Sequence, residues 1–149
     1  MLEMGSEAEK TIRSEGEKAW PNECCGILLG TIDPQAAAEP GFDSVRRRLE
    51  RIIPIENSRE EAEQYHRFEI RSEDLMRAEL EARKTGKDVL GFYHSHPDHP
   101  AEPSDFDREH ALPFYSYVIV SVDRGKAGDL RSWELTPDRA KFLEEEIWR

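Results

Sequence analysis

The sequence predicts an α+β or mixed α/β domain, in which a sheet of about six strands is covered by helices. Three observations lead to this prediction. Short apolar runs of strand length alternate with longer stretches whose apolar residues recur at helical spacing. Residues that favour turns, chiefly proline, glycine and asparagine, separate these stretches. A chain of 149 residues is long enough to bury a core of its own, so we expect a single domain over residues 1–149.

Two helices and three strands are expected in the first part of the chain. The first helix covers residues 4–19, where Met4 and Ile12 fall on one face. The second helix has Ser72 as a candidate N-cap and Gly86 as its C-terminal stop. The full order is a helix over 4–19, a strand over 23–30, a loop over 31–44, a strand over 45–55, a charged loop over 57–64, a short strand over 67–70 and a helix over 72–85.

The second part of the chain is expected to end in a helix. Thr136 followed by Pro137 is the preferred order of an N-cap and a first helical residue. Ala140, Leu143 and Ile147 then recur on one face. Before this helix we expect a strand over 89–96, a proline-rich loop over 97–103, a short helix over 104–112 and strands over 115–122 and 130–135.

The composition excludes several classes of protein. The formal net charge is −11, whereas binding to nucleic acid needs a basic surface. No apolar run approaches the roughly 20 residues of a membrane-spanning helix, and residues 1–10 lack the apolar core of a secretory signal. Cys24 and Cys25 are adjacent and make a poor structural disulfide. We therefore expect a cytoplasmic protein that binds neither nucleic acid nor membrane.

One basic cluster interrupts this acidic composition, formed by Arg46, Arg47, Arg48 and Arg51. Charge runs of this kind usually lie on a solvated surface, here an edge strand. The alternative is a docking patch for an acidic partner.

His94 and His96 are candidate metal ligands. They stand at the end of the apolar strand GFYHSHP. Side chains at positions i and i+2 of a strand point to the same face, so both imidazoles can converge on one ion. Neutral imidazole is a preferred ligand of zinc. Pairs with this spacing also occur at polar strand ends that bind no metal, and that alternative remains open at this point.

Three further polar residues complete the candidate site. Ser104 and Asp107 form the pattern of a helix capping box, which needs no metal. The same helix start could present the Asp107 carboxylate to the two histidines, and two histidines with one carboxylate leave the fourth position of a catalytic zinc site open. Glu23 begins the predicted buried strand over 23–30, where it is either a solvated rim residue or a general base.

These residues together resemble a known signature. His94-x-His96, seven further residues and Ser104-x-x-Asp107, with Glu23 upstream, resemble the full motif of the JAMM (MPN+) zinc metallopeptidases. The segments NECCGILLG, PIEN, RFEI, GFYHSHP and YVIVSV are similar to the small single-domain prokaryotic members, in the same order along nearly the whole chain.

The resemblance implies a cytidine-deaminase-like fold with a curved mixed sheet flanked by helices. It also implies one Zn²⁺ per chain, bound by His94, His96 and Asp107. Glu23 would be the general base that takes a proton from zinc-bound water, and Ser104 would help to hold the oxyanion. His66, His99 and His110 are expected to be ordinary surface or core residues, with the alternative that His99, close to the motif, competes for the metal. Cys24 and Cys25 are expected to be small buried residues rather than ligands.

The activity that the resemblance implies is hydrolysis of a peptide or isopeptide bond after the C-terminal Gly-Gly of a ubiquitin-like or sulfur-carrier protein. We expect residues 67–70 to offer a strand edge to this tail, with a mobile loop over 57–64. A non-catalytic MPN-type scaffold is the alternative, although such scaffolds usually lack a motif residue. A zinc deaminase would need Pro-Cys-x-x-Cys after its His-x-Glu, and this chain has no such segment.

Overall fold

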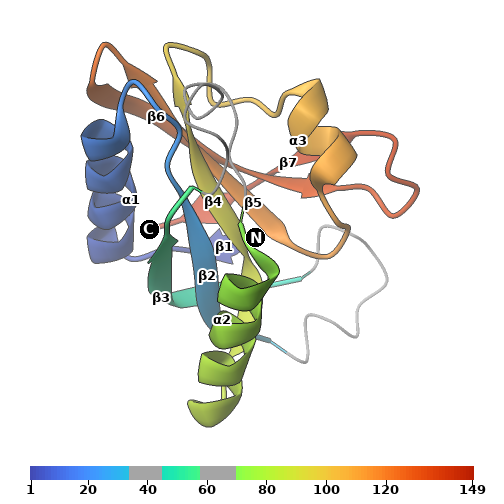
Figure 1. The fold of residues 1–149 in the computed structure, drawn as a ribbon. Helices are drawn as coiled ribbons and strands as arrows, with labels where there is room; N and C mark the ends of the chain where they lie inside the picture. Colours follow the sequence, from blue (N-terminus) through green and yellow to red (C-terminus); the bar gives the residue numbers. More distant parts are fainter. Residues whose placement is uncertain (34–44, 58–69) are drawn as a thin grey trace.

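The computed structural model describes residues 1–33, 45–57 and 70–149, which form one curved mixed sheet with helices on both faces (Figure 1). In chain order the elements are β1 (Leu2–Glu3), α1 (Ser6–Ala19), β2 (Cys25–Ile32), β3 (Arg47–Ile55), α2 (Ser72–Lys84), β4 (Asp88–Pro97), α3 (Asp105–His110), β5 (Ser116–Asp123), β6 (Lys126–Leu135), β7 (Phe142–Glu145) and β8 (Ile147–Trp148). The strand order is β7-β6-β5-β4-β2-β3-β1-β8. The prediction of a mixed α/β fold is confirmed.

The two longer helices cover opposite faces of the sheet. Successive strand residues point to opposite faces, so Leu28 of β2 packs in the core beneath α1 while Ile27 and Leu29 pack in the core beneath α2. The α1 helix comes so close to β5 that a Cβ on Gly16 would lie 2.9 Å from the Val122 side chain. In Figure 1, α1 and α2 stand on either side of the central strands.

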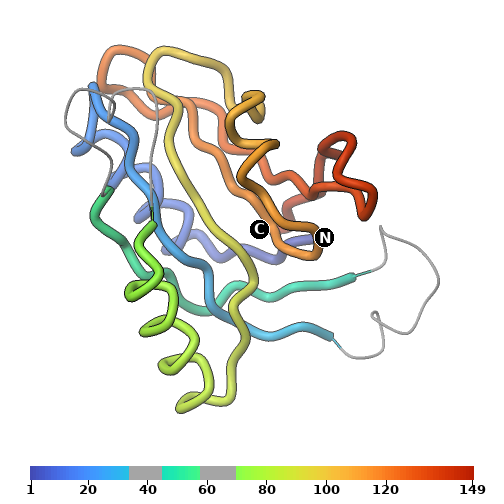
Figure 2. Tube along the Cα trace, turned by 45° about the vertical axis from the view of Figure 1, so that its right-hand side comes forward, coloured from blue at the N-terminus to red at the C-terminus, as the bar shows by residue number. Residues whose placement is uncertain are grey.

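The last strands close the sheet on itself. The order begins with β7 and ends with β8, yet only Glu146 separates these two strands in the chain. The N–H groups of Leu2 and Met4 donate to the carbonyl oxygens of Glu146 and Trp148, at 2.9 and 2.7 Å. Figure 2 shows both chain ends together at this seam. Across this curve the Arg47 side chain of β3 reaches Glu134 of β6 and Glu145 of β7.

The prediction of a C-terminal helix is wrong. Residues 142–145 form β7, antiparallel to β6, and 147–148 form β8. Thr136 is the reason, because its N–H donates to the Lys141 carbonyl at 2.9 Å and closes a turn. The Asp138 carboxylate accepts from the Thr136 hydroxyl and the Ala140 N–H, and Arg139 takes a left-handed φ of 63°. Side-chain hydrogen bonds of this kind favour a turn over a helix.

Smaller differences concern element ends and strand number. The N-cap of α2 is Arg71 rather than Ser72, and it makes no side-chain capping bond. Gly86 ends α2 as predicted, with a left-handed φ of 66°. Eight strands are present among the described residues, against about six expected, because two-residue strands such as β1 carry no periodic signal.

Some expectations fall partly outside the described residues. The predicted loops over 31–44 and 57–64, and the predicted strand over 67–70, contain residues 34–44 and 58–69, which the structure leaves undescribed. In the described part of the chain, no helix has the length and apolar character needed to cross a membrane.

The arginines of the basic cluster point to different sides of strand β3, so one of them is buried and others face solvent. Arg47 is buried, and its guanidinium contacts the carboxylates of Glu134 and Glu145 at 2.6 and 3.2 Å. Arg48 and Arg51 point to solvent, where each pairs with a glutamate. Arg47 is a core residue, so neither a solvated edge strand nor a docking patch for an acidic partner describes it.

Candidate metal centre

The end of β4 brings the two histidines onto one face of the sheet. His94 and His96 alternate with Ser95, whose hydroxyl points the other way and accepts from the Cys24 N–H at 2.8 Å. Both imidazoles are buried, with His94 only 1% and His96 6% exposed. Their Nε2 atoms lie 3.1 Å apart, so the strand aims them at one point.

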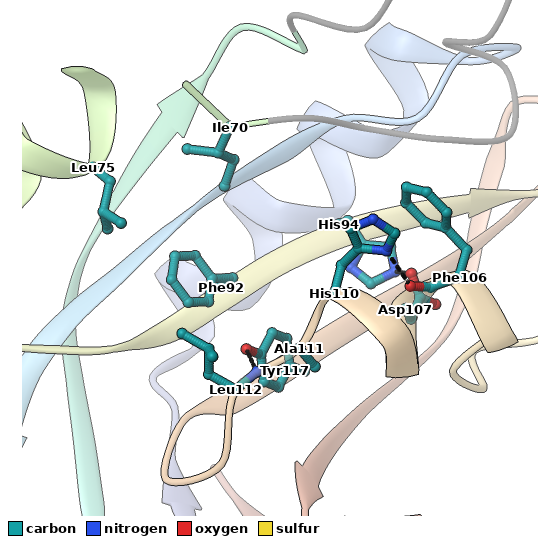
Figure 3. Close-up of a pocket in the computed structure, with 10 residues that line it drawn as sticks. All are labelled: Ile70, Leu75, Phe92, His94, Phe106, Asp107, His110, Ala111, Leu112 and Tyr117. Atoms are coloured by element: carbon teal, nitrogen blue, oxygen red, sulfur yellow. Dashed lines mark hydrogen bonds and ion pairs between the residues drawn. The ribbon is translucent and has the colours of Figure 1, made fainter. Parts of the chain in front are cut away.

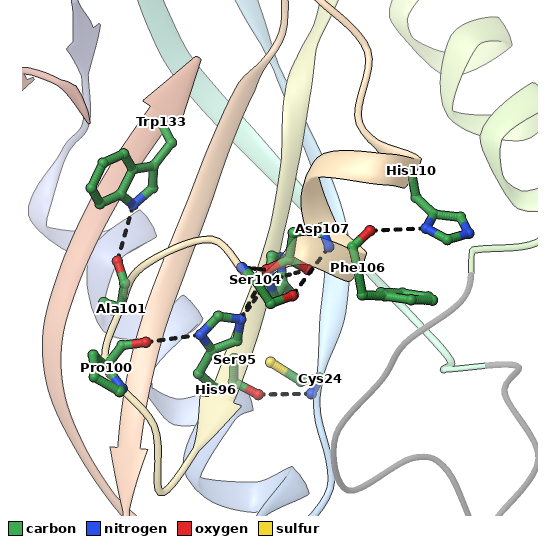
Figure 4. A network of polar contacts seen from close by, with 11 residues as sticks. Cys24, Ser95, His96, Pro100, Ala101, Ser104, Phe106, Asp107, His110 and Trp133 are labelled. Carbon is green, nitrogen blue, oxygen red and sulfur yellow. Dashed lines mark hydrogen bonds and ion pairs between the residues drawn. The ribbon is translucent and has the colours of Figure 1, made fainter. Parts of the chain in front are cut away.

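The start of α3 places a carboxylate at the same point. The Ser104 hydroxyl accepts from the Asp107 N–H at 3.1 Å, and the Asp107 carboxylate accepts from the Ser104 N–H at 2.8 Å. This is the predicted capping box. It also orients the carboxylate, whose Oδ2 lies 3.1 Å from His96 Nε2 and whose Oδ1 lies 3.3 Å from His94 Nε2. Figure 4 shows the capping box and the contact between Asp107 and His96.

The geometry of the three side chains fits one metal ion. Ligand atoms at about 2.0–2.2 Å from a tetrahedral zinc lie roughly 3.3–3.6 Å from one another. The three separations of 3.1, 3.1 and 3.3 Å are close to this range. His94, His96 and Asp107 could therefore hold a metal, with a fourth position left for water or substrate.

Hydrogen bonds fix the protonation of the candidate ligands. A carbonyl oxygen only accepts, so the contact of 2.8 Å between His96 Nδ1 and Pro100 O requires the proton on Nδ1. In the neutral ring, the Nε2 lone pair then faces the metal position. Burial opposes ionisation of Asp107, but the charges and hydrogen bonds of His94 and His96 outweigh it and hold its pKa well below the usual range. Burial, the largest influence on His94, lowers the pKa of that imidazole.

Strand pairing brings Glu23 to the same place. Cys25 is opposite His94 in the antiparallel β2–β4 pair, and the Cys24 carbonyl accepts from the Ser95 N–H. Glu23 directly precedes Cys24, just outside the paired part of β2. Glu23 is only 6% exposed. Burial lowers the pKa of His96, and Asp107, the Pro100 carbonyl and, least of all, the charge of Glu23 raise it.

The two cysteines and the remaining described histidines lie outside the candidate metal group of His94, His96 and Asp107. Cys24 and Cys25 are buried free thiols, and neither belongs to the set of converging ligand atoms. His99 and His110 are exposed and lie outside the set of converging atoms. His66 lies outside the described residues.

An apolar pocket of about 410 Å³ opens beside the candidate ligands. Figure 3 shows His94 and Asp107 on one side of it and Ile70 and Leu75 on the other. The full lining is Ile70, Leu75, Phe92, His94, Phe106, Asp107, His110, Ala111, Leu112 and Tyr117. The metal position thus faces a recess large enough to receive part of a peptide chain.

Residues that the sequence did not single out hold the loop behind His96. The Trp133 indole donates to the Ala101 carbonyl at 3.0 Å. The neighbouring Pro100 carbonyl accepts the hydrogen bond from His96. The Asp98 carboxylate accepts from the Arg124 N–H at 2.7 Å. These partners come from distant strands and turns, so no local pattern in the sequence indicated them.

A comparison with protein families agrees with this arrangement. The family described as prokaryotic homologs of the JAB domain matches residues 6–136 of the chain. This chain belongs to the prokaryotic JAB family. The resemblance to the JAMM (MPN+) group is thereby confirmed.

Relatives of this JAB protein share its whole length. A desampylase of Haloferax volcanii is 31% identical over 147 residues, covering 95% of this chain and 93% of the relative. The solution structure of a Salinibacter ruber protein is 38% identical, with a TM-score of 0.73, and covers 100% of this chain and 91% of that one. A JAB1/MPN domain protein from Archaeoglobus fulgidus, 18% identical with a TM-score of 0.53, covers 99% and 95% and shows the same fold.

Proposed function

We propose that this JAB protein is a zinc-dependent isopeptidase or peptidase. Its substrate is a ubiquitin-like or sulfur-carrier protein, and the bond that it cleaves follows the C-terminal Gly-Gly. The observation that carries the proposal is the convergence of His94, His96 and Asp107 at 3.1–3.3 Å, beside an open pocket. The desampylase relative supports the class of reaction. The free cysteines and acidic composition favour a cytoplasmic protein without nucleic-acid or membrane partners.

Each site residue has a separate task in this proposal. A bound zinc ion would polarise the substrate carbonyl and activate water. His94, His96 and Asp107 hold the ion, and Pro100 fixes the ring of His96. Glu23 accepts a proton from the attacking water. The Ser104 hydroxyl stabilises the oxyanion that forms at the carbonyl carbon.

The pocket supports an extended tail as the substrate. A Gly-Gly segment has no side chains, so a narrow recess beside the metal can admit its backbone up to the reacting carbonyl. Leu75, Phe92 and Leu112 give this path apolar walls. Residues before the Gly-Gly can then occupy the part of the pocket lined by Ile70.

We expect about one equivalent of zinc per chain, and cleavage only when it is bound. His94→Ala and Asp107→Ala should each lower both zinc content and turnover, because the site loses a bond. His99→Ala is the matched control, since this exposed histidine follows the motif but lies outside the group. Metal analysis measures the zinc, and mass spectrometry follows a carrier protein extended past Gly-Gly. Zinc retained by His94→Ala at the wild-type level, or no cleavage by zinc-loaded wild type, contradicts the proposal.

Ser104→Ala should separate stability from chemistry. Loss of the cap should cost about 1 kcal/mol, and loss of the oxyanion contact should lower kcat by about 10²–10³-fold. Zinc content should stay, because the Ser104 backbone N–H still holds the Asp107 carboxylate. Denaturant unfolding and turnover measure the two effects, and Ser104→Thr, which keeps the hydroxyl, should lose little of either. An Ala variant that changes stability alone would leave Ser104 as a cap only.

A further inference from the structure

His110 is the polar side chain of the pocket that has no task so far. The other polar lining groups are accounted for: His94 and Asp107 belong to the proposed metal site, and the Tyr117 hydroxyl accepts from the Leu112 N–H at 2.7 Å. The remaining walls are apolar. Pockets of this kind orient their ligands with a few well-placed polar groups, and His110 is the one left to do so among the described lining residues.

The imidazole of His110 is held in one orientation. Its Nδ1 lies 2.9 Å from the Phe106 carbonyl oxygen, and its ring stacks on the Phe106 ring with centroids 4.1 Å apart at 29°. Since the carbonyl only accepts, the neutral ring carries its proton on Nδ1 and presents a lone pair at Nε2. Figure 4 shows the ring at the outer side of α3, turned away from Asp107.

The Nε2 atom of His110 is available to a ligand. The residue is exposed, and no described residue makes a hydrogen bond to this atom. A Gly-Gly tail offers only backbone N–H and C=O groups, and an N–H that enters an apolar pocket without an acceptor loses its hydrogen bond to water. A fixed acceptor at the rim removes that penalty.

We propose that His110 is a substrate-binding residue, whose Nε2 accepts a hydrogen bond from a backbone N–H of the extended carrier tail in the pocket. This inference rests on the proposed function, because it takes the Gly-Gly tail as the ligand. It assigns to His110 a part in holding the substrate and none in the chemical step. Ring stacking on Phe106 positions the acceptor in advance, so little order is lost when the tail binds.

The test compares His110→Phe with His110→Gln. Phe keeps a ring for stacking but removes the acceptor, and KM should rise by about 3- to 10-fold, the usual value of one neutral hydrogen bond, with kcat and zinc content unchanged. Gln keeps an acceptor and should restore most of the loss. Glu109→Gln, an exposed neighbour outside the pocket lining, should leave all three quantities unchanged. Carriers N-methylated at each terminal glycine in turn locate the bond: one of them should lose affinity for wild type but not for His110→Phe.

The outcomes separate this inference from the proposed function. Two results overturn the role of His110 and leave the proposed reaction unaffected. In the first, wild type and His110→Phe both cleave the carrier with the same KM. In the second, both proteins respond equally to every N-methylated carrier. If zinc-loaded wild type does not cleave, the ¹⁵N resonance of His110 Nε2 is followed while the carrier ending in Gly-Gly is added. A shift of that resonance supports the binding role without the reaction, and an unchanged resonance overturns it.

Discussion

Glu23→Gln should lower kcat by about 10²–10⁴-fold, the usual contribution of a positioned acid or base, while zinc content stays near wild type. The amide has nearly the same shape as the carboxylate but cannot accept a proton from water. The charge of Glu23 acts on His96, but Glu23 lies outside the set of converging ligand atoms. Metal analysis and turnover of a Gly-Gly-extended carrier measure the two quantities on the same preparation.

A matched control distinguishes the base from a general loss of charge. Glu15 is a partly buried acid on α1, which covers the other face of the sheet, and Glu15→Gln should leave turnover and zinc unchanged. A Glu23→Gln variant that cleaves as fast as wild type would refute the mechanism even with zinc bound. Loss of zinc in that variant would instead make Glu23 a support of the metal group.

The metal group could be predicted from the sequence because its geometry is local. The period of a strand alone puts His94 and His96 on one face. Ser104 and Asp107 form a capping box within one helical turn, and that box orients the carboxylate toward the histidines. Glu23 was different: its place depends on the pairing of β2 with β4, 71 residues apart at the Cys24–Ser95 contact. Only the likeness to a family motif indicated it.

The features that sequence patterns missed depend on the closure of the sheet. Ala140, Leu143 and Ile147 fit the period of a helix, but the turn at Thr136 returns the chain to the edge of β6, where a strand gains a full ladder of hydrogen bonds. The same segment then pairs with β1. Closure buries one side of β3 at Arg47, while the period of a strand alone cannot say which of its two faces is covered.

Arg47→Leu should destabilise the protein by about 3–5 kcal/mol at pH 8, because it leaves buried carboxylates without their main counter-charge. The Arg47 guanidinium lies between Glu134 and Glu145, and it also donates to the Phe114 carbonyl at 3.0 Å. Even with Arg47 present, burial and the charge of Glu145 raise the pKa of Glu134 to about 7. Denaturant unfolding at fixed pH measures the loss.

The loss of stability in Arg47→Leu should be larger at high pH than at low pH. A carboxyl group with a raised pKa in the folded state stabilises the fold below its unfolded pKa, and that stability is lost as the pH rises through the folded value. Without Arg47 the buried Glu134 carboxyl ionises at a higher pH than in wild type, so Arg47→Leu should recover much of its stability at pH 5. Adding Glu134→Gln should recover part of it at pH 8, because one of the two buried charges is then absent.

Arg48→Leu is the control: this neighbour pairs with Glu3 at the surface, 3.2 Å away, and its loss should cost at most about 1 kcal/mol. Equal losses in the Arg47 and Arg48 variants, or a loss in Arg47→Leu that does not change with pH, would contradict a buried ionic centre at the closure of the sheet.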